Sequence, residues 1–185
     1  MPNHVTNRIT IKGKAKDVKT FIEDVKSDEN DFDFKKIKPM PSNIFRWNLW
    51  QAEKEKYGKN NWYDWSIENW WTKWNSYEVY NDCNEKELDE WDKYIECEIF
   101  FQTAWSTPEP IFNEIYNKYI VWMGLDLEFE IEFADEDIGS NYGYVSISKN
   151  WFDLQYEHLD DKEWPQFACE ILWIDYGEYL SWQED

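Results

Sequence analysis

The sequence contains little of what most enzymes and membrane proteins are built from. Its 185 residues include 2 histidines, 3 cysteines and 6 glycines. No apolar run reaches the ~20 residues that a spanning helix needs, and the opening MPNHVTNRITIKGK is too charged for a signal peptide, which predicts a cytoplasmic protein. No glycine-rich phosphate loop and no paired CxxC motif occurs, so we expect neither a cofactor nor a metal.

The few cysteines and histidines form no catalytic set in the sequence. Cys83, Cys97 and Cys169 are odd in number and far apart, which favours three buried or inert thiols over a metal site or a redox motif. His4 and His158 have no serine, cysteine or metal constellation near them in the sequence. We therefore predict that the protein is not an enzyme.

Positive charge is scarce as well. The chain has 19 Lys and Arg against 39 Asp and Glu, a net charge of −20 at pH 7. This sign opposes direct binding to nucleic acid or to an anionic membrane, and it favours a basic partner. Aromatic residues make up 20% of the chain, too many for a disordered acidic segment, so we expect one folded domain over residues 1–185.

Periodic patterns predict the order of the main elements. The first element alternates strictly, with Val5, Asn7 and Ile9 on one face and Arg8 and Lys12 on the other, as in a strand. The further elements expected are a helix at 18–25, a short strand at 32–37, a strand at 94–101, a helix at 107–119 and strands at 125–133 and 142–148. The second helix should begin at Thr107, whose hydroxyl can cap it.

Two segments fall outside this regular order. Residues 42–92 are predicted to be an aromatic-rich insertion, and residues 151–185 a C-terminal extension that is compatible with helix or strand. The rest predicts an α+β fold, the ferredoxin-like plait: βαβ-βαβ plus an extra strand, in an antiparallel sheet with the helices on one face. The first and third strands should be central, with the fourth beside the first.

Four segments together resemble a known family. They are MPNHVTNRITIKG, FDFKKIKPMP, YDWSIENWWTKWNSYEV and FFQTAWSTPEPIF, and they are similar to the YubB-type ferredoxin-like domain family of phages, plasmids and other mobile elements. The resemblance implies the plait and a protein that acts in the cytoplasm of a bacterial host, and it suggests a role against host defences. Where that family has glycine before Thr72, this chain has Trp71.

The stretch YDWSIENWWTKWNSYEVY, residues 63–80, concentrates four tryptophans. In one interpretation Trp65, Trp70 and Trp74 fold back over the open face of the sheet as a satellite core. In another they line a pocket that stacks a base or a sugar ring, and in a third they bind a protein partner. The candidate pocket residues are Asp64, Trp65, Glu68, Asn69, Trp70, Lys73 and Trp74. Asp64 and Glu68 are also the carboxylate pair that a glycosidase would need.

A second candidate surface is a ladder of acidic residues. Side chains at alternate positions of a strand stand about 6.7 Å apart, so the acids of 126–132 form a regular negative row that could imitate a phosphate track. Arg8 and Lys12 on the first strand can neutralise part of it. The predicted partner-binding residues are Glu96, Glu98, Asp126, Glu128, Glu130, Glu132, Asp135, Glu136 and Asp137.

The leading functional hypothesis is an acidic mobile-element protein that binds and inhibits a basic nucleic-acid-handling host protein, such as a CRISPR effector nuclease or a restriction system. Exposed aromatic residues such as Trp47, Trp50 or Trp71 would anchor that interface. The alternative is a nucleotide-binding or sugar-binding protein that uses the tryptophan-rich insertion. A third is a carboxylate-dependent hydrolase or nuclease.

Overall fold

The core of the molecule is an antiparallel sheet of six strands in the order β2-β3-β1-β4-β5-β6. The computed structural model describes residues 3–149, 151–153 and 164–182. The strands are β1 (His4–Lys14), β2 (Tyr77–Asn81), β3 (Tyr94–Ala104), β4 (Leu127–Asp135), β5 (Gly143–Ser148) and β6 (Trp151–Asp153). The central position of β1 and β3, with β4 beside β1, confirms the sheet order predicted from the sequence.

The alternation of β1 divides the sheet into two faces. Val5, Asn7 and Ile9 are fully buried on the inner face, whereas Arg8 and Lys12 are half-buried on the other. Ile9 stands opposite Ile99 of β3 and Ile131 of β4, so apolar side chains meet in rows across three strands. Each such fully buried side chain stabilises the fold by roughly 1.5–3 kcal/mol.

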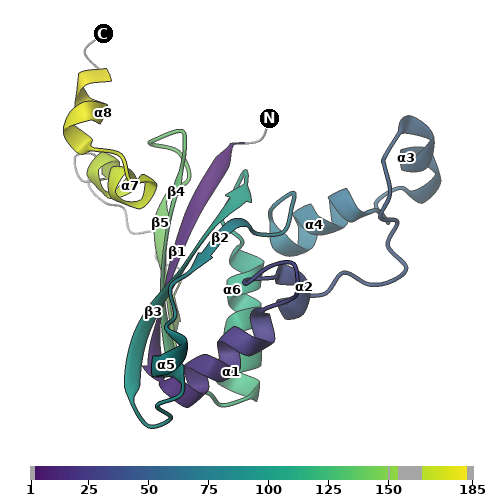
Figure 1. Ribbon diagram of the computed structural model, residues 1–185. Coiled ribbons are helices and arrows are strands. Elements are labelled where there is room, and N and C mark those ends of the chain that lie inside the picture. The colour runs from purple at the N-terminus through teal and green to yellow at the C-terminus, as the bar shows by residue number, and fades with distance from the viewer. Residues whose placement is uncertain (1–2, 150, 154–163, 183–185) are drawn as a thin grey trace.

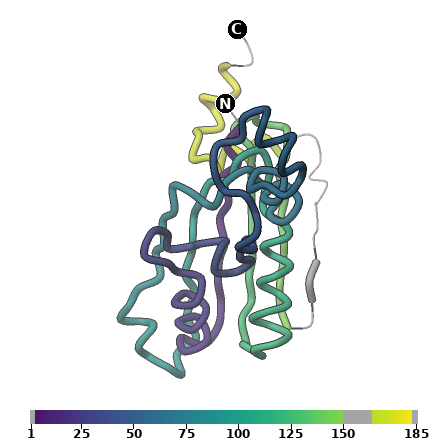
Figure 2. The backbone as a smooth tube through the Cα atoms, turned by 90° about the vertical axis from the view of Figure 1, so that its right-hand side faces the viewer, coloured from purple at the N-terminus to yellow at the C-terminus, as the bar shows by residue number. Residues whose placement is uncertain are grey.

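Two helices cover the inner face. Figure 1 shows α1 (Ala15–Val25) and α6 (Glu109–Ile115) on the same side of the sheet, and the side view in Figure 2 shows them next to each other along it. Phe21 of α1 lies edge to face against Phe129 of β4, with ring centroids 5.0 Å apart. The ferredoxin-like arrangement predicted from the sequence is confirmed.

The remaining helices are shorter or lie outside this layer. They are α2 (Phe34–Ile37), α3 (Gln51–Tyr57), α4 (Trp62–Trp70), α5 (Glu85–Leu88), the π-helix η1 (Tyr116–Trp122), α7 (Trp164–Leu172) and α8 (Tyr176–Trp182). The segment that holds α3 and α4 projects from the inner side of the sheet, and α7 and α8 lie on the opposite side (Figure 1). None of the helices in the described ranges is long and apolar enough to cross a bilayer.

The strand predicted at 32–37 is wrong. Residues Phe34–Ile37 form the short helix α2 because the carboxylate of Asp33 accepts a hydrogen bond from the backbone N–H of Lys35 at 2.8 Å and caps it. The strand beside β3 is instead β2, from within the segment predicted to be an insertion. Its pairing with β3 shifts register between Tyr77 and Tyr80, where Glu78 has a φ of 49°.

The helix predicted from Thr107 forms, but its cap differs. Pro108 occupies the cap position, and no side chain caps the helix. The Thr107 hydroxyl instead donates to Oδ1 of Asn7 at 2.7 Å, inside the core. The helix then continues past Ile115 as η1, so it extends beyond the predicted end at residue 119.

The prediction of three inert thiols is wrong for two of them. Cys83 and Cys97 form a disulfide, with their Cα atoms 4.9 Å apart, whereas Cys169 is free and buried. The sequence spacing hid this pair because the pairing of β2 with β3 is what brings Cys83 next to Cys97. The bond joins the segment after β2 to a central strand.

Candidate functional site

The face of the sheet turned away from α1 and α6, called the outer face below, carries two rows of carboxylates. β3 contributes one row and β4 the other, and β1 runs between them. The five glutamates are Glu96, Glu98, Glu128, Glu130 and Glu132. On β1 between the rows stand Arg8 and Lys12, with Lys14 at the strand end. The predicted acid ladder is therefore assembled on one surface.

Neutralisation within the outer face is partial. Nε of Arg8 donates to Glu132 at 2.7 Å, and Nζ of Lys12 lies 2.7 Å from Glu130 and 3.9 Å from Glu96. Glu98 accepts from the hydroxyl of Thr10 at 3.3 Å. In the part of the chain that the structure describes, no cation lies within ion-pair distance of Glu98 or Glu128. Partly exposed ion pairs such as these contribute about 0–1 kcal/mol each to the stability of the fold.

The pKa values of neighbouring groups reflect this negative field. The hydrogen bond to Glu130, with the charges of Glu130 and Glu96, raises the pKa of Lys12 despite some desolvation. Burial is the first cause that raises the pKa of Tyr144, and the charges of Glu130 and Glu132 add to it. An approaching cation would meet the same field, so the outer face favours a basic surface.

The acidic residues that flank β4 do not all belong to the outer face. Asp126 is exposed just before the strand, at one end of the rows. Asp135 is 4% exposed and accepts from the amide of Asn3 and from the backbone N–H of Asp137, so its role is structural. Glu136 accepts from the backbone N–H of His4. The prediction of Asp135 as a partner-binding residue is wrong, because the glutamates of the outer face have even numbers and the odd-numbered Asp135 lies on the inner side of β4.

Helix α7 and the following Trp173 cover one end of the outer face. Ala168 and Ile171 of α7 pack against Ala134, and the ring of Trp173 lies 5.2 Å from that of Phe100. Glu96 and Glu128, toward the other end, remain exposed. The accessible carboxylates are therefore those around Lys12.

The tryptophans of the predicted pocket are divided between core and surface. Trp70 is 3% exposed, and its indole N–H donates to the carbonyl of Lys38 at 3.0 Å. Its ring lies edge to face against Trp65, at 5.2 Å, and against Phe34, at 5.9 Å. Trp74 is 39% exposed. Trp70 belongs to the main hydrophobic core and Trp65 packs against it, so the predicted satellite core does not form as a separate cluster, and Trp74 lies at the surface.

The predicted polar residues of the pocket do not converge. Asp64 accepts from the side chain of Asn61 at 2.5 Å, at the first turn of α4. The amide of Asn69 donates to the carbonyl of Trp65, within the same helix, and Glu68 is exposed. None of Asp64, Glu68 and Asn69 lines the neighbouring hollow, so no pair of carboxylates faces a common space there.

A hollow of 510 Å³ lies beside this helix, with a different lining. Of the predicted pocket residues, Trp70, Lys73 and Trp74 line it. The other lining residues are Lys35, Pro39, Met40, Arg46, Trp62, Ser66 and Asn75. Sequence reasoning missed Lys35 and Arg46 because they converge on α4 only in the folded chain. The signal in the sequence that could have indicated this hollow is the presence of basic residues within an aromatic segment of a strongly acidic protein.

Trp71 occupies a backbone conformation that suits glycine. It ends α4 with φ 62° and ψ 8°, the left-handed region that L residues other than glycine seldom adopt. The chain nevertheless has a tryptophan at this position, and its side chain is 49% exposed.

We expect Trp71→Gly to be more stable than Trp71→Ala by about 0.5–1 kcal/mol, because both substitutions remove the half-buried indole but only glycine adopts the left-handed backbone without strain. Urea denaturation of the two variants measures the difference. The matched control is the pair Trp47→Gly and Trp47→Ala, at an exposed residue without positive φ, where glycine should give no gain over alanine. A Trp71→Gly variant no more stable than Trp71→Ala would contradict the strain argument.

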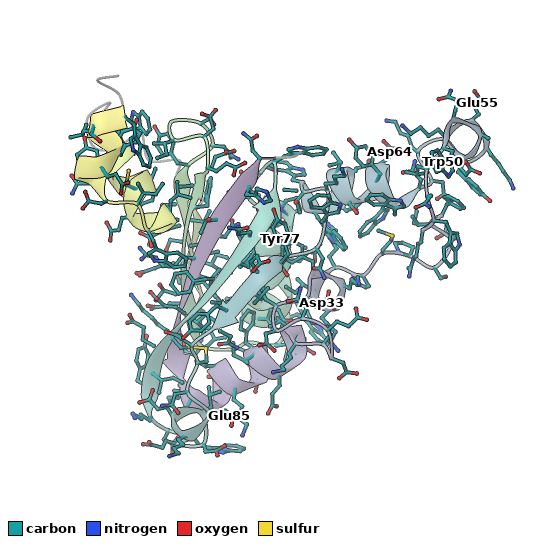
Figure 3. All side chains as sticks on the ribbon, turned by 45° about the horizontal axis from the view of Figure 1, so that its top comes forward. Asp33, Trp50, Glu55, Asp64, Tyr77 and Glu85 are labelled. Atoms are coloured by element: carbon teal, nitrogen blue, oxygen red, sulfur yellow. A yellow bond between two sulfur atoms is a disulfide. The ribbon has the colours of Figure 1, made fainter. Side chains whose placement is uncertain are left out.

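The predicted aromatic anchors lie apart from the acidic rows. Trp47 and Trp50 are 78% and 71% exposed. Figure 3 labels Trp50 next to α3, at the far end of the projecting segment and away from the outer face. Exposed aromatic residues nearer the rows are Tyr80, Tyr94 and Trp173. An interface centred on the outer face would use these residues instead.

One group of side chains is spaced closely enough to hold a metal ion. It consists of Asp82, Cys83 and Cys97, whose ligand atoms lie within 4.8 Å of one another, and it is the sole such group in the described ranges. The two sulfurs are bonded to each other, and Asp82 accepts from the backbone N–H of Glu98. His158, singled out in the sequence, lies outside the described residues.

Comparison with known proteins adds one finding. A family model described as a ferredoxin-like domain in Api92-like protein matches residues 70–168, just over half of the chain. No curated protein and no solved structure matches the chain. The matched region includes β3 and β4, which carry the two rows of glutamates. The match supports the ferredoxin-like family predicted from the sequence.

Proposed function

The chain belongs to the family of ferredoxin-like domains in Api92-like proteins, and on that premise we propose that it is a phage or plasmid protein that binds and inhibits a basic host protein. The partner handles nucleic acid, as a CRISPR effector nuclease or a restriction complex does. Such effectors hold nucleic acid in positively charged channels. The protein acts by occupying that channel, without catalysis of its own.

The observation that carries this proposal is the pair of carboxylate rows on the outer face. Within a row the side chains repeat about every 6.7 Å, and the rows on β3 and β4 are separated by one strand, about 10 Å in all. That separation lies between the widths of the minor and major grooves of B-DNA, about 6 and 12 Å. A protein channel that binds the phosphates of DNA would therefore meet negative charges on the outer face at a spacing comparable to that of the phosphates.

The charge of the whole molecule supports the same partner class. A net charge of −20 creates a field that accelerates encounter with a basic surface and weakens as salt is added. The aromatic residues Tyr80 and Tyr94, 62% and 60% exposed, flank the rows and offer apolar contact once the surfaces meet. Specific binding then depends on the outer face and not on charge alone.

The test is inhibition of DNA cleavage by a panel of purified CRISPR effectors and restriction complexes. We expect inhibition of at least one of them at low salt, weakened as ionic strength rises. Replacing Glu98, Glu128 and Glu130 by lysine should weaken inhibition by about tenfold to a hundredfold, because the three new positive charges would repel the basic partner.

A matched variant separates position from total charge. Glu29, Glu55 and Glu68 are exposed and lie outside the outer face, and their replacement by lysine changes the net charge equally. This control should inhibit almost as well as the unmodified protein. Equal losses in both variants would contradict the outer-face interface, and a panel without any inhibition at low salt would contradict the function.

A further inference from the structure

The 510 Å³ hollow beside α4 has a positively charged lining, although the molecule as a whole is negatively charged. Its lining includes Lys35, Arg46 and Lys73 and no aspartate or glutamate, although acids outnumber bases two to one in the chain. A larger hollow of 920 Å³ shows the contrast, since Asp28 and Glu29 are among its lining residues. The local excess of positive charge is therefore a property of this hollow.

The three cations are not neutralised by neighbouring carboxylates. No aspartate or glutamate in the described part of the chain forms an ion pair with any of them. The guanidinium of Arg46 donates to the carbonyls of Met40 and Pro41, at 2.7 and 3.2 Å. The Nζ of Lys73 lies 4.7 Å from the ring centroid of Trp74. These contacts position the charges without cancelling them, so an anion would be attracted.

The walls of the hollow are aromatic. Trp62, Trp70 and Trp74 all line it. Trp70 is 3% exposed and belongs to the core, so the rings that a ligand can reach are those of Trp62 and Trp74. The indole N–H of Trp62 already donates to the carbonyl of Trp47, so Trp62 offers ring surface and not a hydrogen bond. Such surfaces stack on planar rings of any base.

One buried polar group also lines this space. Ser66 is 1% exposed and lines the hollow, which places a hydroxyl group at its wall. The hollow thus combines ring surface, positive charge and a hydroxyl group.

We propose that this hollow binds a nucleoside phosphate, with the base against the tryptophans and the phosphate near Lys35, Arg46 and Lys73. Its volume lies within the range of about 300–1,000 Å³ that is typical of small-molecule sites. The strongly negative protein repels a long polyanion, which favours a free mononucleotide over the end of a nucleic-acid strand. This site is on the inner side of the sheet, so it does not depend on the function proposed for the outer face.

The test is titration of the full chain by calorimetry with AMP, GMP, CMP and UMP, and separately with adenosine and inorganic phosphate. We expect at least one mononucleotide to bind about tenfold or more tightly than either of the two fragments, because both parts of the site are then occupied. A 5′-phosphorylated oligothymidylate forms the last arm. Tighter binding of this oligonucleotide than of the mononucleotides would support the site but assign it to a strand end.

Two variants locate the binding. Trp74→Ala and Lys73→Gln should each weaken mononucleotide binding by about tenfold, through lost stacking and lost charge. The matched controls Trp122→Ala and Lys86→Gln change exposed residues outside the hollow and should bind normally. Absence of binding at millimolar mononucleotide, or equal losses in variants and controls, would overturn the proposal.

Discussion

Trp70→Ala is expected to lower the free energy of unfolding by about 3–5 kcal/mol, as removal of a buried tryptophan usually does. Trp70 is 3% exposed, contacts the rings of Trp65 and Phe34, and donates its indole N–H to Lys38. Its loss would leave a cavity and an unpaired carbonyl between α4 and α2. Urea denaturation, with an unchanged slope, measures the effect.

Two further substitutions separate the parts of this effect. Trp70→Phe keeps most of the ring contact but removes the hydrogen bond to Lys38, so an intermediate loss of about 1–2 kcal/mol is expected. Trp74→Ala, at a residue 39% exposed, should cost less than about 1 kcal/mol. If Trp70→Ala cost no more than Trp74→Ala, the assignment of Trp70 to the core would be wrong.

Asn7→Ala should destabilise the protein by about 2–4 kcal/mol, because it removes the centre of a buried hydrogen-bond network. Asn7 is fully buried. Its amide donates to the carbonyl of Val5 and to the hydroxyl of Thr103, both at 3.0 Å, and its oxygen accepts from Thr107 at 2.7 Å. The network therefore joins β1, β3 and the start of α6.

A double-mutant cycle tests whether this network acts as a unit. Thr107→Val removes the hydroxyl that donates to Asn7, so the double variant Asn7→Ala/Thr107→Val should lose less than the sum of the single losses. We expect a coupling of about 0.5–2 kcal/mol in thermal or urea denaturation. Additive effects would show that Thr107 finds another acceptor and that the network does not determine stability here.

The parts of the fold that could be predicted from the sequence are those with long, unbroken periodicity. β1, β3 and β4 are nine or more residues long, and the inner and outer sides of each follow from the alternation along most of that length. The short segment around Phe34 could not be assigned, because four residues hold too little pattern and the Asp33 cap decides the outcome. The length of the periodic pattern, and not the hydrophobicity of the segment, therefore decides whether an element could be predicted.

The candidate sites show the same division. The glutamates of the outer face lie on long strands, so the sequence places them together correctly. The basic hollow is formed by Lys35, Arg46 and Lys73, which come from three segments without a common period. The disulfide between Cys83 and Cys97 escaped prediction for a related reason, since it depends on the pairing of a five-residue strand. Such contacts follow from the packing of irregular segments.

The shifted register of β2 bears on self-association. A straight, fully extended edge strand invites a second molecule to continue the sheet, and proteins that expose one tend to aggregate. Here the edge strand has five residues and is interrupted where Glu78 turns into positive φ, so its backbone groups cannot align with another strand along their length. The irregular β2 edge thus disfavours the addition of a further strand at that side of the sheet.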